Sequence, residues 1–393
     1  MSEIKQHWQK IELNEILSIS SKKFNPIGNN ENKKCVELEH LSQETGKLLG
    51  YTNSSEQQSI KNSFEEGQIL FGKLRPYLKK FWKAEFEGVC SSEIWVMNGK
   101  KVKNDFLFYL VQTEKFNQIA NVSSGSKMPR ADWNYMSEIP FDIPPLKEQE
   151  KIAEILTTWD EAITKQTELL EAKELQKKAL MQKLLSGEVR FDGFSDKWKE
   201  VRIDKLFDFK KGQELSKEKL EKNGIFECIL YGELYTTYSE VISEIKSKTN
   251  IKEGIKSKID DILIPASTTT SAIDLAIAST IQKDNVLIGG DINILRKKTN
   301  NINGEFISKY LTHIKKMEIA KYAQGITIIH LYSKDFKHLK IKLPSLPEQQ
   351  KIAEVLSLAD DEINLLKNEL EELNLQKKAL MQKLLTGEVR VKV

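Results

Sequence analysis

An internal repeat limits the fold of this 393-residue chain more than any other feature of its sequence. Residues 144–190 align without a gap to residues 344–390, two hundred positions later. Both copies contain the run LQKKALMQKLL and end in GEVR. A second match opens each half of the chain, HWQKIELNEIL from His7 and KWKEVRIDKLF from Lys197. Chance does not produce matches of this length, so we expect two related structural units.

The repeat divides the chain into four segments. Two variable segments, 1–143 and 191–343, alternate with two repeated segments, 144–190 and 344–393. In chain order the four segments carry net charges of +1, −1, +5 and −2. The excess of Lys and Arg therefore lies in the variable segments, which a polyanion would prefer.

Each repeated segment is predicted to form one long helix. Prolines lie just before both predicted helices or in their first turn, where a missing N–H is harmless, and Gly187 and Gly387 end them. Apolar residues recur at alternating spacings of three and four, the seam of a coiled coil. About forty residues at ~1.5 Å each would give a rod of about 60 Å. The predicted helix-pairing residues are Ile152, Leu156, Trp159, Ile163, Leu170, Leu180 and Leu184, then Ile352, Leu356, Ala359, Ile363, Leu366, Leu370, Leu373, Leu380 and Leu384.

Taken alone, such helices indicate only a dimerisation coiled coil. Two equivalent helices in one chain can instead pair with each other as antiparallel partners, in a pseudo-two-fold arrangement. Two-fold proteins on DNA read two half-sites at a fixed separation. Unequal domains on such a frame would read an unequal, bipartite site. Gln166 and Lys173 interrupt the first seam where the second has Leu366 and Leu373, so we expect a bend or a wetter face there.

The variable segments are predicted to be compact α/β (α+β) domains with curved or barrel-like sheets, because short apolar runs alternate with helical stretches. Several loops combine cations, aromatic rings and hydroxyl groups, which suit phosphates and base edges. For each residue, a solvated strand face or an ordinary surface turn explains the pattern equally well. The candidate DNA-binding residues are Lys73, Arg75, Tyr77, Lys79, Lys80, Ser124, Ser126, Lys127 and Arg130, then Tyr231, Tyr235, Thr268, Thr269, Thr270 and Thr327.

Motifs of catalysis do not occur in this sequence. It has no Walker A pattern, no GxGxxG after a predicted strand and no GxSxG. The three cysteines form no CxxC pair, and the five histidines have no metal-ligand spacing. No apolar run approaches a membrane span of ~18 residues. We therefore expect a cytoplasmic recognition and assembly subunit, with no catalytic residue, no bound metal and no membrane partner.

The repeated segments and several motifs of the variable segments closely resemble the specificity subunit of type I restriction–modification systems. The resemblance covers essentially the whole length. It is most specific in PPLKEQEKIAEIL and PSLPEQQKIAEVL, which open the repeated segments, and in QKKALMQKLL with GEVR, which close them. The variable segments resemble target recognition domains through FGKLRPYLKK and CSSE in the first, and through YGELYTTY, GGD and AQGITI in the second.

The resemblance implies a role within a larger assembly. Each target recognition domain would enter the major groove of double-stranded DNA at one half of a bipartite site, and the helices would set the spacer. Two modification (methyltransferase) subunits would dock on the chain, and restriction (translocase/nuclease) subunits would join them. S-adenosylmethionine, ATP and Mg would bind to those partners, leaving no cofactor in this chain.

Two other classes of function stay open at this point. One is a coiled-coil scaffold with protein-binding end domains; salt-dependent binding to duplex DNA would separate it from a DNA reader. The other is an enzyme with an unrecognised site, such as a stand-alone nuclease. Cleavage or methylation of DNA by the purified chain alone would indicate that class.

Overall fold

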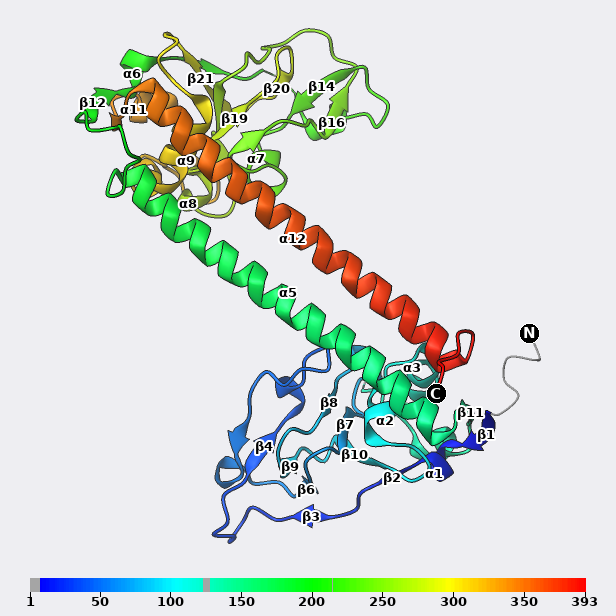
Figure 1. Cartoon of the computed structure of the whole chain (residues 1–393). Helices are drawn as coiled ribbons and strands as arrows, with labels where there is room; N and C mark the ends of the chain where they lie inside the picture. Colours follow the sequence, from blue (N-terminus) through cyan, green and yellow to red (C-terminus); the bar gives the residue numbers. More distant parts are fainter. Residues whose placement is uncertain (1–7, 123–127, 214) are drawn as a thin grey trace. The chain divides into compact units, whose positions relative to one another are not determined.

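The computed structural model describes residues 8–122, 128–213 and 215–393 (Figure 1). The chain forms two compact units, and each takes residues from both halves of the sequence. As far as they are described, Met1–Glu168 and Lys367–Val393 make up the first unit, and Leu169–Leu366 the second. Both units mix helices with sheets, which confirms the predicted α/β (α+β) class. The boundaries of the four predicted segments stay predictions.

The described part of the first unit contains three sheets, all open. Their strand orders are β1-β11, β2-β10-β7-β8 and β3-β6-β9-β4-β5. Pairing is antiparallel except between β4 and β9. The strands are β1 (Gln9–Glu12), β2 (Leu17–Ile19), β3 (Lys23–Phe24), β4 (Lys34–Val36), β5 (Thr52–Asn53), β6 (Lys61–Phe64), β7 (Ile69–Gly72), β8 (Phe81–Lys83), β9 (Gly88–Cys90), β10 (Ile94–Gly99) and β11 (Pro140–Ile143). The helices are α1 (Leu13–Ile16), α2 (Asn104–Leu110), α3 (Glu114–Ala120) and α4 (Trp133–Ser137), with 3₁₀ turns η1 (Leu38–His40), η2 (Ser54–Glu56) and η3 (Pro76–Leu78).

The second unit has four open sheets in its described residues, ordered β12-β23, β13-β21-β17-β19-β15, β16-β14-β20 and β18-β22. None of these sheets is a closed barrel. The strands are β12 (Lys199–Arg202), β13 (Phe207–Lys211), β14 (Phe226–Ile229), β15 (Val241–Ile242), β16 (Ser247–Thr249), β17 (Asp261–Pro265), β18 (Ser267–Thr268), β19 (Ser279–Ile281), β20 (Leu287–Ile288), β21 (Ile292–Lys297), β22 (Ile329–His330) and β23 (Lys340–Leu343). The helices are α6 (Ile203–Leu206), α7 (Glu233–Thr236), α8 (Ala272–Leu275), α9 (Gly304–His313), α10 (Lys316–Ala320) and α11 (Ser333–Phe336), with the 3₁₀ turn η4 (Lys217–Lys219).

The repeated segments form the two long helices α5 (Leu146–Ser186) and α12 (Leu346–Thr386), of 41 residues each. At 1.5 Å per residue each helix is about 60 Å long. Both end at the predicted glycines, Gly187 with φ 75° and Gly387 with φ 71°, a left-handed conformation that favours glycine. Among the described residues, every helix is too short or too polar to cross a membrane.

Within each unit, part of α5 runs antiparallel to part of α12. In the first unit Lys377 binds Asp160, and Gln166 donates to Glu369 across 2.9 Å. Polar side chains thus pair across the helices in this half of the seam. In the second unit Lys173 lies 2.6 Å from Glu362, and Lys177 binds Asp360. The two residues that interrupt the apolar seam, Gln166 and Lys173, are therefore used for polar contacts between the helices.

The two similar regions of the repeat contact each other within each unit. Trp8, in the opening segment of the first half, donates through Nε1 to Glu148 across 3.1 Å. The same carboxylate accepts from Arg390 Nε at 2.9 Å, just after α12 ends. In the second unit, Arg190 donates to Glu348 from Nε at 2.7 Å and from Nη2 at 2.8 Å. Trp198, which corresponds to Trp8, packs against the core that contains Leu184 and Leu185 near the end of α5. These contacts explain why the opening segments and the helix ends retain the repeat while the middle diverges.

The largest apolar core of each unit also joins domain and helix residues. In the first unit Phe106 and Phe116 share a buried cluster with Leu156 and Leu384. In the second, Phe306 and Phe336 share one with residues from both long helices. Each unit is therefore stabilised as a single body of domain and helix.

Candidate nucleic-acid interface

Two candidate segments of the first unit, around Lys73 and Arg130, have equivalents in the second unit around Ala266 and His330. After β7 in the first unit, Leu74 pairs with Arg130 in an isolated bridge. After β17 in the second unit, Ser267 pairs with His330. The flanking backbone bonds also correspond, Ala131 N to Lys73 O at 2.9 Å and Leu331 N to Ala266 O at 2.9 Å. Sequence comparison did not reveal this equivalence, because FGKLRP and IPASTT have no letters in common at matching places.

The first site is built around a short turn with unusual backbone geometry. Arg75 (φ 52°) and Lys79 (φ 47°) flank the turn η3, and both adopt the left-handed conformation. Non-glycine residues rarely adopt it, and it costs of the order of 1 kcal/mol. The backbone N–H of Arg75 donates to Pro129 across 2.8 Å, which fixes the turn against residues 128–131. Surrounding structure thus holds a strained turn that presents two cationic residues.

The predicted residues of the first site differ in their availability. Arg75 and Tyr77 are exposed, and Lys73 is half-buried. Lys79 pairs with Glu44 at 2.7 Å, and the ammonium of Lys80 donates to the Leu38 carbonyl at 2.6 Å. Ser124, Ser126 and Lys127 lie outside the described residues.

Arg130 is held by a carboxylate beside the first site. Its guanidinium donates twice to Glu93, at 2.9 Å and 3.0 Å. That hydrogen bond, ahead of the nearby charges of Lys73 and Arg130, keeps the pKa of Glu93 below its ordinary value. The candidate DNA-binding residues did not include Glu93, although it is the last residue of the family-like motif CSSE.

In the second site hydroxyl groups take the place of cations. Thr268 is buried on β18, whereas Thr269 and Thr270 are exposed. The Thr270 hydroxyl donates to Asp274 at 2.5 Å, and Ser271 caps α8 through the same carboxylate. The side chains of Thr270, Ser271 and Asp274 therefore form a connected polar network at the end of β18.

Aromatic rings lie beside the second site. Tyr235 shares a hydrogen bond with Thr268, while burial raises the pKa of its phenol. Its ring centroid is 6.4 Å from that of the more exposed Tyr231. His330 and Tyr332, which the sequence did not single out, stack at 5.7 Å with an angle of 13° between their planes. Their only signal in the sequence was closeness to the predicted Thr327, which is exposed.

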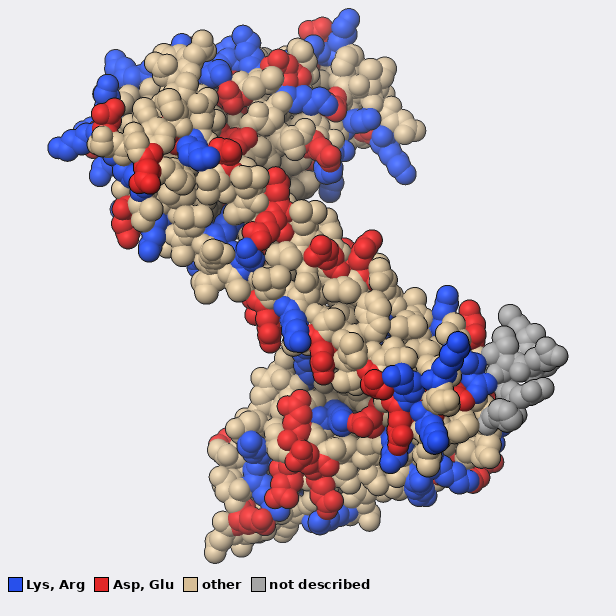
Figure 2. Space-filling model, in the orientation of Figure 1, with Lys and Arg blue, Asp and Glu red and all other residues tan. Residues whose placement is uncertain are grey.

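Overall charge does not define either site. On the face that Figure 2 shows, Lys and Arg side chains are interspersed with Asp and Glu over the described surface. Selectivity for a nucleic acid would therefore depend on local groups at the two sites rather than on one broad basic field.

Two equivalent glutamines, Gln149 on α5 and Gln349 on α12, attach the domains to the long helices. Gln149 is buried, accepts from Lys103 N at 3.1 Å and donates to Pro144 O at 2.9 Å. Gln349 is buried likewise, accepts from Asn303 N at 3.0 Å and donates to Pro344 O at 2.9 Å. A buried amide with its hydrogen bonds satisfied fixes orientation, because leaving such groups unpaired is costly.

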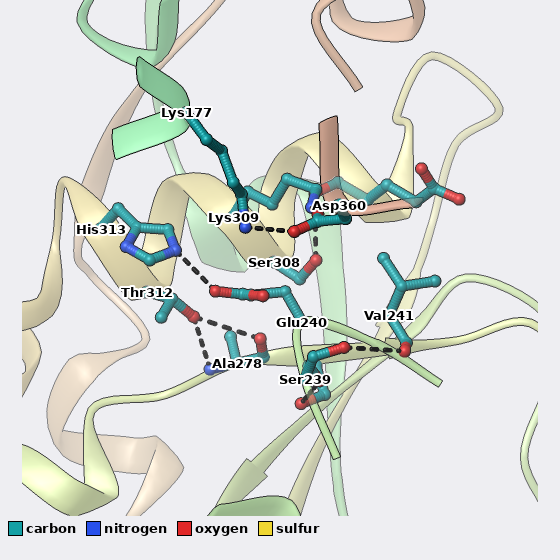
Figure 3. A network of polar contacts seen from close by, with 12 residues as sticks. Lys177, Ser239, Glu240, Val241, Ala278, Ser308, Lys309, Thr312, His313 and Asp360 are labelled. Atoms are coloured by element: carbon teal, nitrogen blue, oxygen red, sulfur yellow. Dashed lines mark hydrogen bonds and ion pairs between the residues drawn. The ribbon is translucent and has the colours of Figure 1, made fainter. Parts of the chain in front are cut away.

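In the second unit an ion pair with a buried lysine adds to this attachment (Figure 3). Lys309, from α9, donates to Asp360 of α12 at 2.7 Å, and Lys177 of α5 binds the same carboxylate. One turn further along α9, His313 lies 2.6 Å from Glu240. These contacts place the domain that carries the hydroxyl-rich site on both long helices.

The predicted helix-pairing residues fall into two groups. Residues toward the helix ends join the domain cores: Ile152, Leu156, Leu380 and Leu384 in the first unit, and Leu180, Leu184, Ile352 and Leu356 in the second. The middle residues are buried or half-buried along the helices: Trp159, Ile163, Ala359, Ile363, Leu366, Leu170, Leu370 and Leu373. The seam thus supplies the domain cores as well as the helix pairs.

Known proteins share this organisation. A family model, the type I restriction modification DNA specificity domain, matches the chain twice, over residues 5–174 and 195–375. The EcoDI type I restriction enzyme specificity subunit of Escherichia coli is 34% identical over 169 residues, which are 42% of this chain and 38% of that protein. The putative MjaX specificity subunit of Methanocaldococcus jannaschii is 25% identical over 422 residues, covering 100% of this chain and 96% of that protein.

Solved structures show the same fold. The HsdS subunit from Thermoanaerobacter tengcongensis superposes with a TM-score of 0.55 at 19% identity, covering 98% of either chain. The family model accounts for well over half of the sequence, in two copies that correspond to the two units. The chain therefore belongs to the family of type I restriction–modification DNA specificity proteins.

Proposed function

We propose that this chain is the DNA-recognition subunit of a type I restriction–modification complex and that it reads an asymmetric, bipartite site. One observation carries the proposal. Equivalent positions after β7 and β17 differ in chemistry: Lys73 and Arg75 in one unit correspond to Ala266 and Thr268 in the other, where the exposed Thr269 and Thr270 follow. A shared frame with different side chains at matching places is what two unlike half-sites require.

Within the first domain, the proposed contacts centre on the exposed residues Arg75 and Tyr77. An arginine can pair bidentately with guanine in the major groove, which discriminates against other bases by ~1–3 kcal/mol. Lys73, Lys79 and Arg130 would contribute phosphate contacts. In the free chain Lys79 pairs with Glu44, and Arg130 pairs with Glu93. Lys80 serves the fold through its bond to Leu38.

Within the second domain, the proposed contacts are hydroxyl groups and rings. Thr269, Thr270 and Thr327 are exposed and can donate or accept, so they suit several base edges. The exposed Tyr231, whose ring lies beside that of Tyr235, would add an aromatic contact. Thr268 is buried and positions this group rather than touching bases.

The helices support a partner that binds twice. In the identical run LQKKALMQKLL, Leu175 is 69% exposed and Leu375 is 60% exposed. The outward-facing residues that follow each leucine are also exposed and identical: Gln176, Lys178, Ala179, Gln182 and Lys183, with Gln376, Lys378, Ala379, Gln382 and Lys383. Packing within the chain does not require identity at exposed positions, and the adjoining helix sequence has diverged. Identical exposed surfaces on both units favour two copies of one partner.

We assign those partners as two modification (methyltransferase) subunits, with restriction subunits completing a cytoplasmic complex. S-adenosylmethionine, ATP and Mg would belong to the partners. This chain would then supply recognition and assembly without a reaction of its own.

Genome-wide mapping of methylated adenines in the host, with and without this gene, tests the proposal. We expect methylation to disappear from one asymmetric, bipartite motif. Unchanged methylation would contradict the assignment. Binding to duplex DNA that is indifferent to salt and sequence would favour a protein scaffold instead. Cleavage or methylation by the purified chain alone would favour an enzyme.

A further inference from the structure

A short hairpin extends from the second site. Gln324 and His330 exchange backbone hydrogen bonds of 2.8 Å and 2.7 Å across it. Gly325 has φ +126°, and a Cβ at this position would lie 2.1 Å from the Ile328 carbonyl oxygen. Only glycine therefore permits this turn. Because β22 within the hairpin pairs with β18, the hairpin is attached to the strand that carries Thr268.

The tip of this hairpin exposes two branched apolar side chains. Ile326 is 99% exposed and Ile328 is 51% exposed, with the exposed Thr327 between them. Single exposed apolar residues are common on protein surfaces. Here the glycine turn places two of them within three residues, next to the hydroxyl groups of the site. Burying either against an apolar group of a ligand would be favourable by ~25 cal/mol per Å².

The surroundings of the tip suit a polyanion. Residues 319–334 contain no Asp or Glu but include Lys321 and Lys334. The two carboxylates that contact site residues already have partners: Asp274 accepts from Thr270 and Ser271, and Asp291 accepts from Ser267 and pairs with Lys211. An apolar tip within a segment free of acidic side chains can approach a phosphate backbone without repulsion.

We propose that Ile326, supported by Ile328, contacts the C5-methyl group of a thymine in the half-site that the second unit reads. Thymine is the one base with a methyl group in the major groove, and apolar side chains recognise it there. This inference rests on the proposed DNA-reading function and adds a specificity-determining residue to it. Ile326 would thus supply apolar selectivity beside the hydroxyl contacts of Thr269 and Thr270.

Replacing thymidine by deoxyuridine removes only the methyl group and so tests the contact directly. The complex with its modification subunits is titrated with duplexes of the mapped site, in which each thymidine of this half-site is replaced in turn. We expect the wild-type complex to lose about fourfold in affinity at one position, the effect of burying roughly one methyl-sized group. Ile326→Ser should bind the thymidine duplex about as weakly as wild type binds the deoxyuridine duplex, and should no longer discriminate between them.

Ile225→Ser is the matched control, because Ile225 is 78% exposed on the same unit but lies outside the hairpin. We expect this variant to discriminate as wild type does. Uniform wild-type affinity for all duplexes of this half-site, or retained discrimination in Ile326→Ser, would overturn the inference while leaving the DNA-reading function intact. Loss of modification subunits from Ile326→Ser, measured by complex mass, would reassign the tip to protein docking. A wild-type complex that binds no duplex would instead refute the proposed function.

Discussion

Lys309 donates to Asp360 across 2.7 Å while only 2% of the lysine side chain is exposed. In the first unit the equivalent position is Tyr109, whose hydroxyl donates to Asp160 at 2.8 Å. The same attachment of a domain helix to a long helix therefore uses a buried charge in one unit and a neutral phenol in the other. A buried ammonium depends on its anion far more than a phenol does.

The two aspartates should consequently differ in their contribution to stability. Asp360→Asn leaves the Lys309 ammonium buried without its anion, and we expect a loss of about 3 kcal/mol in the second unit. Each substitution also removes the anion of a lysine on the other long helix, Lys177 in the second unit and Lys377 in the first. Asp160→Asn retains an acceptor for Tyr109, so we expect the loss in the first unit to be about 2 kcal/mol smaller than in the second. Hydrogen exchange of the α9 and α2 amides measures each unit separately. Equal losses would show that burial of Lys309 does not depend on Asp360.

Glu240 predicts how the second unit responds to acid. Burial alone would raise the pKa of Glu240, but the hydrogen bond with His313, a backbone hydrogen bond and the charges of His313 and Lys309 lower it to about 2. Because an unfolded glutamate titrates near ~4.3, this group adds stability above that pH. The added stability is lost as the pH falls from ~4.3 toward 2.

Glu240→Gln should therefore flatten the acid limb of the stability curve. Between pH 5 and pH 2 (roughly the window set by the two pKa values), we expect a smaller fall in the free energy of unfolding than in wild type. Glu253→Gln, an exposed position of the same unit, is the control and should keep the wild-type slope. Identical slopes for all three proteins would contradict the pKa assigned to Glu240.

Local pattern was sufficient to predict the long helices. The apolar spacing of Ile352, Leu356 and Ile363 places each of them within two turns of the next, and Gly387 ends the helix through its own backbone conformation. The repeat itself also predicted two related units. These features are encoded by neighbours in the sequence, which is why the sequence alone reveals them.

The state of individual candidate side chains could not be predicted in this way. Arg75 and Lys80 occur in the same basic run, yet Arg75 is exposed whereas Lys80 is bonded to Leu38, 42 positions away. Burial of Lys309 likewise depends on Asp360, 51 positions away. Residue type sets the chemistry, but tertiary contacts decide which groups remain available to a ligand.

Arg75 and Lys80 provide a direct comparison of these two roles. We expect Arg75→Ala to weaken binding to the recognised duplex roughly tenfold or more and to relax one base position of its half-site. Lys80→Ala should instead cost about 1 kcal/mol of stability and leave the recognised motif unchanged. Fluorescence anisotropy over a salt series, with motif mapping, measures both effects. Weaker binding by Lys80→Ala at unchanged stability would reverse the assignment.

We expect the long helices to set the length of the spacer between the two half-sites, and lengthening the helices tests this. Because α5 and α12 pair within each unit, an insertion into one helix alone would leave the added residues without a partner. Matched insertions of two heptads are therefore required, after Glu168 in α5 and before Lys367 in α12. Fourteen added residues lengthen a helix by about 21 Å. They rotate the helix surface beyond the insertion by only ~40° relative to the surface before it.

We expect the matched insertion to lengthen the non-specific spacer of the methylated motif. Both half-sites should stay unchanged, because neither domain is altered. Methylated-adenine mapping in the host gives both results in one measurement. The single-helix insertion is the control, and we expect it to abolish methylation of the wild-type motif without creating a longer one. A changed half-site, or an unchanged spacer with the matched insertion, would show that the helices do not set the separation.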